Sequence, residues 1–218
     1  MGRRTEICDI RREELTQAAL KCIAVKGYDR VTLDDVTREA GLSKGIASYY
    51  FKNREELLAS VIQKMWDSIV DLTRKILELP AEGEEQEIYE KVRAYYADPK
   101  VDPLALIRQG IRFLVEWIEE NPTAVKVVLE FWCQVPRNPM ITDLNRSMYR
   151  YLLDVSAIII EEGVRKGVFR KRNPRLAAYI LISGFTGLAY NHIINPSELD
   201  RKALQKDFSE LVLAYLGK

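Results

Sequence analysis

The chain has 218 residues, 47% of them hydrophobic, and its 33 basic and 32 acidic side chains leave a formal net charge of +1 at pH 7. This length suits one large domain, or a small domain joined to a larger one, and the near-zero charge excludes the strongly basic composition that would by itself indicate nucleic-acid binding. The first twelve residues are polar and no run of about 18 apolar residues occurs, so we expect a cytoplasmic protein with no membrane partner.

A first helix is expected over residues 11–26, because apolar side chains recur there at intervals of three and four residues. Gly27 ends the pattern, and Tyr28 is placed to lock this helix onto the segment that follows. Basic residues crowd the start of the helix, and they fit a DNA-contacting arm as well as they fit a solvated charged face. The apolar positions are Leu15, Ala18, Ala19, Cys22 and Ile23, and the basic ones are Arg3, Arg4, Arg11 and Arg12.

Residues 32–54 read as two short helices joined by a turn. Thr32 is placed to cap the first, Gly41 breaks it, and Ser43 is placed to cap a second helix over residues 43–50. One side of that second helix can pack through Ile46, Ala47 and Tyr50. The other side is small, polar and aromatic, which suits an approach to the edges of bases, and it carries Lys44, Gly45, Ser48 and Tyr49.

A third helix follows at once, and its start suits a phosphate group. Asn53 is placed to cap it, with Glu56 three residues later completing a capping box. Free amides at such a helix start attract an anion, and Lys52 and Arg54 lie beside them. The three helices together predict a helix-turn-helix whose second short helix reads DNA.

These residues closely resemble the DNA-binding domain of the TetR family of transcriptional repressors. Nine positions fit the family pattern: Thr32, Val36, Ala40, Gly41, Leu42, Ser43, Gly45, Tyr50 and Phe51. Three depart from it, since Thr37 replaces an alanine, Ser48 replaces a frequent aromatic residue and Arg54 replaces a lysine. The resemblance implies a double-stranded DNA operator as partner and a DNA-binding set of Thr32, Ser43, Lys44, Gly45, Ser48, Tyr49, Tyr50, Lys52 and Arg54.

No strand pattern appears in the remainder, so the sequence predicts an all-α protein. A long amphipathic helix is expected over residues 54–79, followed by helices near 85–96, 104–120, 123–134, 143–166, 174–193 and 199–216. We therefore expect an N-terminal three-helix domain over residues 1–54 and a larger helical domain over residues 55–218. The family resemblance implies that the larger domain dimerises and holds an effector.

The last two helices are the expected homodimer seam. Glycines inside the first of them cost roughly 1 kcal/mol each against alanine, and a close helix–helix approach would offset this loss, although packing within one chain would do the same. The expected interface consists of Gly184, Phe185, Gly187, Leu188, Phe208, Leu211 and Tyr215.

The middle helices are rich in aromatic residues, which suit a small apolar or aromatic effector, although aromatic residues at helical spacing are more often plain core. The expected ligand-binding set is Tyr95, Arg108, Phe113, Trp117, Phe131, Trp132 and Tyr149. The arginine is included because it could serve an anionic group on the ligand.

Nothing in the sequence supports catalysis. His192 lacks any recognised catalytic motif around it, no glycine loop for phosphate occurs, and Cys8, Cys22 and Cys133 lack the spacing of a disulfide framework or a metal site. We therefore expect that the protein is not an enzyme and binds no cofactor. Two hypotheses remain, a ligand-responsive DNA-binding repressor and a helical carrier of a lipid-like metabolite, with an all-helical enzyme as a rarer third. The free polar face beside a cationic helix start favours the repressor.

Overall fold

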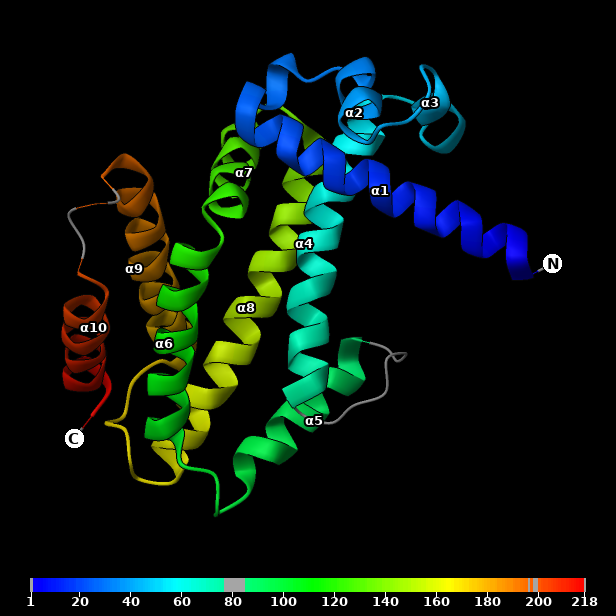
Figure 1. Ribbon diagram of the computed structural model, residues 1–218. Coiled ribbons are helices and arrows are strands. Elements are labelled where there is room, and N and C mark those ends of the chain that lie inside the picture. The colour runs from blue at the N-terminus through cyan, green and yellow to red at the C-terminus, as the bar shows by residue number, and fades with distance from the viewer. Residues whose placement is uncertain (1, 77–84, 196, 198–199, 218) are drawn as a thin grey trace. The chain divides into compact units, whose positions relative to one another are not determined.

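The computed structural model describes residues 2–76, 85–195, 197 and 200–217 (Figure 1). Its first half contains α1 (Gly2–Lys26), the 3₁₀ helix η1 (Tyr28–Arg30), α2 (Leu33–Glu39), α3 (Ile46–Tyr50), α4 (Arg54–Ile76) and α5 (Glu85–Ala97). The second half contains α6 (Pro103–Glu120), α7 (Pro122–Gln134), α8 (Pro139–Arg165), α9 (Pro174–Ile194) and α10 (Arg201–Leu216). The predicted all-α fold is confirmed.

Three helix starts differ from the sequence prediction by three residues or more. Helix α1 begins at Gly2 rather than near Arg11, so the N-terminal arginines belong to a helix. Helix α3 begins at Ile46 rather than Ser43. Helix α8 begins at Pro139 rather than Asp143, because proline is well suited to the first turn of a helix. The expected end of the long helix at residue 79 lies outside the described residues.

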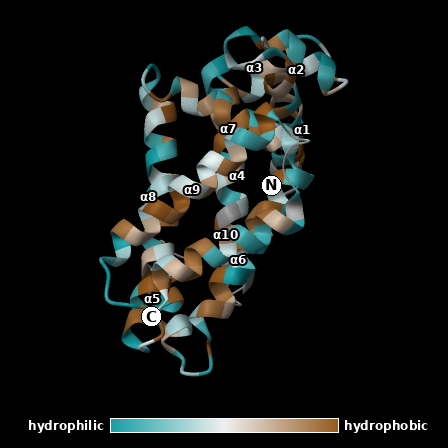
Figure 2. Ribbon diagram, turned by 90° about the vertical axis from the view of Figure 1, so that its left-hand side faces the viewer, coloured by the Kyte–Doolittle hydropathy of each residue, from teal (hydrophilic) through white to brown (hydrophobic). Residues whose placement is uncertain are grey.

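The helix starts in the second half of the chain follow simple capping chemistry. The Asp102 side chain accepts from the Leu104 amide at 2.9 Å, and Pro103 occupies the first helical position of α6. Asn173 accepts from the Leu176 amide at 3.1 Å ahead of Pro174 in α9. Figure 2 shows hydrophilic and hydrophobic segments alternating along the helices, as an amphipathic pattern requires.

The chain divides into two compact units. Unit 1 comprises Met1–Ile69 and Thr123–Ser147, and unit 2 comprises Val70–Pro122 and Met148–Lys218. Unit 1 therefore contains the whole helix-turn-helix together with the first part of α4, α7 and the start of α8, which is more than the expected domain over residues 1–54. Its core is built around Leu15, Ile23, Tyr28, Val36, Ala47, Phe51, Leu57, Leu58, Val127, Phe131 and Ile141.

Unit 2 has its own core, formed by α6, α8, α9, α10 and the α8–α9 loop. Its members are Ile111, Val115, Ile160, Phe169, Ala177, Ala178, Val212 and Leu216. Helix α9 is long and apolar enough to cross a membrane by length and composition, with a mean hydropathy of 1.2 in its most apolar window, yet only 17% of that window is buried within the chain. A helix that packs on another subunit has the same composition, so this observation alone does not indicate a membrane span.

Candidate nucleic-acid interface

Helix α2 begins with the cap that the sequence predicts. The Thr32 hydroxyl accepts from the Asp35 amide at 3.2 Å, and the Asp35 carboxylate accepts from the Thr32 amide at 3.1 Å. Lys26 at the end of α1 donates to the same carboxylate at 2.5 Å. This lysine and the Thr32 side chain together lower the pKa of Asp35 to about 2. The contribution to stability is therefore fully present above the ordinary carboxylate pKa and is lost only as the pH falls towards about 2.

The turn after α2 differs from the prediction at its second half. Gly41 is left-handed, with φ of 66°, as expected. Ser43 does not cap the reading helix: Gly45 occupies the cap position with φ of 87°, and the Ser43 carbonyl accepts from the Ile46 amide at 3.1 Å. The left-handed glycine moves the cap position by two residues, from Ser43 to Gly45. The reader is therefore a tight turn, residues 43–45, followed by the five residues of α3.

The two faces of this reader are those that the periodicity predicts. Ala47 is buried at 1% exposure, which fixes α3 to the core of unit 1. Ser43, Lys44, Gly45 and Ser48 are exposed, and Tyr49 is 71% exposed, with its ring edge-on to Tyr50 at 5.0 Å between centroids. Lys44 forms an ion pair with Asp34 at 3.1 Å, and both side chains remain open to solvent. The buried side of α3 thus fixes the helix to the core, while its polar and aromatic side stays open to solvent.

The departure at Thr37 is accommodated inside α2. Its side chain is only 3% exposed, and its hydroxyl donates to the Asp34 carbonyl at 3.1 Å. The buried hydroxyl therefore has a partner, which avoids the cost of an unsatisfied polar group.

The start of α4 is capped by Asn53, whose side-chain oxygen accepts from the Glu56 amide at 2.8 Å. The reciprocal bond of the expected capping box falls one residue earlier, since Glu56 accepts from the Lys52 amide at 2.7 Å rather than from Asn53. The Lys52 side chain is exposed. Its contact with a phosphate at this helix start stays a prediction.

Arg54 requires a correction, because its side chain faces the protein. The guanidinium donates to the Val31 carbonyl at 2.5 Å and to the Tyr28 carbonyl, and it lies 5.0 Å from the centroid of the Tyr28 ring. A third contact joins it to Glu55 at 3.3 Å, and the side chain is only 24% exposed. The sequence shows the charge of this residue but cannot show that two backbone carbonyls of η1 and the following residue face it.

Removing Arg54 should therefore reduce stability rather than a phosphate contact. We expect Arg54→Ala to lower the free energy of unfolding by about 3 kcal/mol, because it leaves two carbonyls without their charged donor. Lys52→Ala should leave stability unchanged and reduce the slope of log K against log salt by about one. Urea unfolding and salt-dependent DNA titration of both variants check this pair, and a lower salt slope with normal stability for Arg54→Ala would contradict it.

Arg12 is also part of the domain rather than a free arm. Its guanidinium donates to the Tyr50 carbonyl at the end of α3, lies 4.3 Å from the Phe51 ring centroid and contacts Glu56 at 3.6 Å. A cation on a terminal carbonyl favours a helix end. Arg12 thus ties α1 to the far end of the reader.

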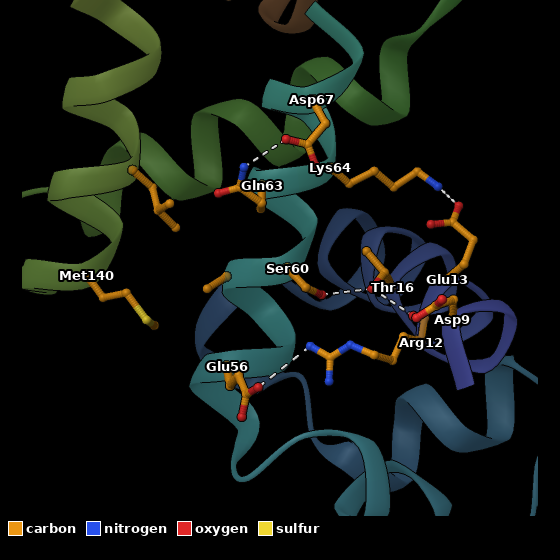
Figure 3. A pocket seen from close by; sticks show the side chains of 12 residues that line it. Asp9, Arg12, Glu13, Thr16, Glu56, Ser60, Gln63, Lys64, Asp67 and Met140 are labelled. Atoms are coloured by element: carbon orange, nitrogen blue, oxygen red, sulfur yellow. Dashed lines mark hydrogen bonds and ion pairs between the residues drawn. The ribbon is translucent and has the colours of Figure 1, made fainter. Parts of the chain in front are cut away.

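A cavity of about 490 Å³, lined mostly by polar and charged residues, opens between α1, α4 and α8 (Figure 3). Thr16 and Ser60 form a hydrogen bond across it at 2.8 Å, and Lys64 pairs with Glu13. Burial lowers the pKa of Lys64. A second cavity of about 480 Å³ lies beside α1 and α2 and includes Cys22. Neither cavity is lined by a residue of the expected ligand-binding set.

Comparison with known proteins agrees with this geometry. A family model described as bacterial regulatory proteins, tetR family, matches residues 15–61, and one described as BetI-type transcriptional repressor, C-terminal, matches residues 103–217. The chain belongs to the TetR family of transcriptional regulators. The matches cover the helix-turn-helix and more than half of the chain beyond it.

Individual relatives are distant. The HTH-type transcriptional regulator BetI of Klebsiella pneumoniae (strain 342) is 25% identical over 95% of this chain and 94% of its own length. The protein of the same name from Stenotrophomonas maltophilia (strain R551-3) is 29% identical over 63% of this chain and 61% of its own length. A putative transcriptional regulator from Saccharomonospora viridis, solved in complex with choline, has a TM-score of 0.75 at 20% identity and covers 96% of this chain and 99% of its own.

The expected effector residues of this TetR-family protein do not all lie in one unit. Phe131 and Trp132 belong to unit 1, and the other five belong to unit 2. Phe131 packs in the core, 1% exposed and edge-on to Tyr28 at 5.5 Å, so it is a core residue rather than part of an open pocket. In unit 2, the exposed side chains are Tyr95, Arg108 and Phe113, and the half-buried ones are Trp117 and Tyr149.

A tyrosine cluster in unit 2 includes Tyr89, which sequence reasoning missed. Tyr89 of α5 and Tyr151 of α8 have ring centroids 5.7 Å apart, and Tyr96 lies edge-on to Tyr95 at 5.2 Å. Burial, together with Tyr95 and Tyr151, raises the pKa of Tyr96 to about 12, so its hydroxyl stays protonated at physiological pH. The seven-residue spacing of Tyr89 and Tyr96 on one helix face was the available signal.

The expected dimer residues are all half-buried or exposed within one chain. A Cβ at Gly184 would lie 3.3 Å from the Phe208 ring, so this pair packs within one chain. Tyr215 is engaged by Arg172, whose guanidinium lies 4.0 Å from the ring centroid. Leu211 is 64% exposed, and Phe185, Gly187 and Leu188 are half-buried. Further large apolar side chains of α9 are exposed: Leu176, Tyr179, Ile180, Tyr190 and Ile194.

Proposed function

We propose that this TetR-family regulator is a repressor that binds an operator as a homodimer and leaves it when a small effector binds. The observation that carries the proposal is the reader itself, in which buried Ala47 holds a face that presents Lys44, Ser48 and Tyr49 to solvent. A carrier protein has no use for such a face. The length of the reader and the polar and aromatic character of its exposed face suit the major groove, where base edges are distinguishable.

Within this proposal, contacts to bases and contacts to phosphates fall on different residues. Lys44, Ser48 and Tyr49 read bases, and Thr32, Tyr50 and Lys52 position the protein on the backbone, with Ser43 and Gly45 shaping the turn between them. Arg54 supports the start of α4 from inside. Operator binding of this kind places the protein in the cytoplasm.

Replacing Tyr49 should change which sequences are preferred rather than how strongly all DNA is bound. We expect Tyr49→Ala to lose about 1–3 kcal/mol of discrimination at the positions it reads, with an unchanged salt slope. Selection of bound duplexes from a random pool, with wild type and variant in parallel, checks this. Tyr95→Ala, which removes an exposed tyrosine of unit 2, is the control. An identical preferred motif for Tyr49→Ala and wild type would contradict the assignment.

The homodimer is proposed on the exposed apolar side chains of α9 and α10. Tyr179 at 53% and Ile194 at 63% exposure would remain in water in a single chain, as would Leu211 of α10. Large contiguous apolar surfaces on soluble proteins indicate interfaces. Two-fold pairing of these helices would also give the protein two readers for two half-sites.

The effector site is proposed in unit 2, at the tyrosine cluster of α5 and α8. Faces of aromatic rings bind apolar, aromatic and organic-cation groups well, and the related fold from Saccharomonospora viridis was solved with choline, an organic cation. We therefore widen the sequence-based expectation of an apolar or aromatic effector to include an organic cation. Effector binding would lower operator affinity by changing the separation of the two readers, with α4 as one connection.

A further inference from the structure

The short link η1 joins α1 to the helix-turn-helix. Charged side chains hold the backbone N–H and the backbone carbonyl of its first residue, Tyr28. The Tyr28 N–H donates to Oε2 of Glu130 in α7 at 2.8 Å. The Tyr28 carbonyl accepts from Arg54 at the start of α4. Glu130 is 102 residues away in sequence, yet it belongs to the same compact unit. Tyr28 is therefore held between a carboxylate of α7 and a guanidinium of α4.

Further contacts from the same side reinforce this arrangement. Gln134 donates to Asp29 at 3.3 Å, and Asn138 donates to the Tyr28 hydroxyl at 3.3 Å. Phe131 packs edge-on against the Tyr28 ring. Helix α7 and the residues that follow it thus engage the backbone, ring and hydroxyl of η1.

Gly27 shows how closely α7 approaches the link. Its φ of 79° is a conformation that other residues rarely adopt, and a Cβ built on it would lie 3.3 Å from Oε2 of Glu130. The carboxylate thus occupies the space beside the residue at which the chain leaves α1. The direction of the chain from α1 into α2 is set at this point.

We propose that Glu130 is a positioning residue for the DNA reader, fixing the direction in which the helix-turn-helix leaves α1. The inference rests on the proposed function and adds a second connection to it. Tyr28 lies in the segment matched by the tetR family model, and Glu130 lies in the segment matched by the BetI-type C-terminal model. A residue of the C-terminal segment therefore acts on the reader through η1, in addition to the connection that the continuous helix α4 makes.

The test measures how strictly the protein requires the correct distance between half-sites. Two duplexes are compared: a fragment selected by the wild-type protein, and the same fragment with one base pair inserted between the half-sites, which separates them by about 3.4 Å more. We expect the wild type to bind the inserted duplex about 100-fold more weakly. Glu130→Ala should bind the original duplex about tenfold more weakly than wild type, and the penalty for insertion should fall to about tenfold.

A merely structural role would weaken binding to both duplexes alike and leave the ratio unchanged. Glu130→Gln retains an acceptor oxygen and should restore most of the discrimination. Lys126→Ala, which removes an exposed side chain of α7, should leave both affinities unchanged. The Tyr28 amide should also exchange its hydrogen at least about tenfold faster in Glu130→Ala.

The outcomes separate the two proposals. If Glu130→Ala loses as much affinity on insertion of the base pair as the wild type does, the positioning role alone is overturned. If the wild-type protein selects no DNA, the proposed function and the positioning role are overturned together. Should the alanine variant fail to fold, Glu130→Asp takes its place. Its carboxylate is one methylene short of the Tyr28 amide, so an unreduced insertion penalty in that variant overturns the positioning role equally.

Discussion

Introducing charges at two exposed apolar positions, Ile180→Asp and Leu211→Glu, is expected to give a monomer that binds its operator at least about 100-fold more weakly than wild type. Both side chains are open to solvent in one chain, at 44% and 64% exposure, so the changes spare the core of unit 2. A buried unpaired charge in a subunit interface is strongly unfavourable. The loss of affinity follows because two linked half-site contacts become two independent weak ones. Analytical ultracentrifugation and operator titration measure the two effects.

The choice of positions matters in this experiment. Phe208 packs against Gly184 within the chain, so a charge at that position would damage the fold as well as the interface. Phe113→Glu is a matched control, since Phe113 is an exposed large apolar residue of α6 in the same unit, at 43% exposure. It should leave the dimer and the operator affinity unchanged. A double variant that remains dimeric would place the seam elsewhere.

Effector binding is expected to lower operator affinity about 5- to 150-fold, which corresponds to about 1–3 kcal/mol of coupling. Linkage requires operator DNA to weaken effector binding by the same factor. A ligand would first be found by thermal shift, in a panel that includes choline, other organic cations and apolar aromatic compounds. Titrating that ligand with and without the operator, and the operator with and without the ligand, gives two coupling factors that must agree.

The tyrosine cluster supplies the variant for this measurement. Tyr96→Ala should weaken the ligand at least about tenfold while leaving operator affinity in the absence of ligand unchanged. Lys171→Ala is the control, because it removes an exposed side chain of the α8–α9 loop in the same unit. Equal ligand affinity with and without operator would exclude coupling and would make the bound ligand irrelevant to release.

Local chemistry made much of the fold predictable. The caps at Thr32 and Asn53, and the glycine at position 41, act within three or four residues, so their spacing alone indicates where helices begin and end. The two faces of α3 follow from helical periodicity in the same way. The start of α3 was misplaced because Ser43 and Gly45 are both acceptable caps, and only the left-handed backbone at Gly45 decides between them.

Tertiary partners could not be predicted in this way. Arg54 has the charge of a phosphate ligand, but its guanidinium faces carbonyls 23 and 26 residues earlier in the chain. Phe131 has the periodicity of a pocket residue, yet it packs on Tyr28. Glu130 carries no local pattern at all, because its partner is a backbone amide in a distant segment. Sequence spacing records which face a residue occupies, and it does not record what lies opposite.

Operator reading by a dimer is best tested by selecting bound fragments from the genome of the source organism with the wild-type protein at physiological salt. We expect one enriched motif with two-fold symmetry, whose half-sites are centred about one turn of DNA apart, roughly 34 to 36 Å, and whose base preferences change in Tyr49→Ala. Enrichment of no motif, with binding to all duplexes that differs only with salt, would contradict it.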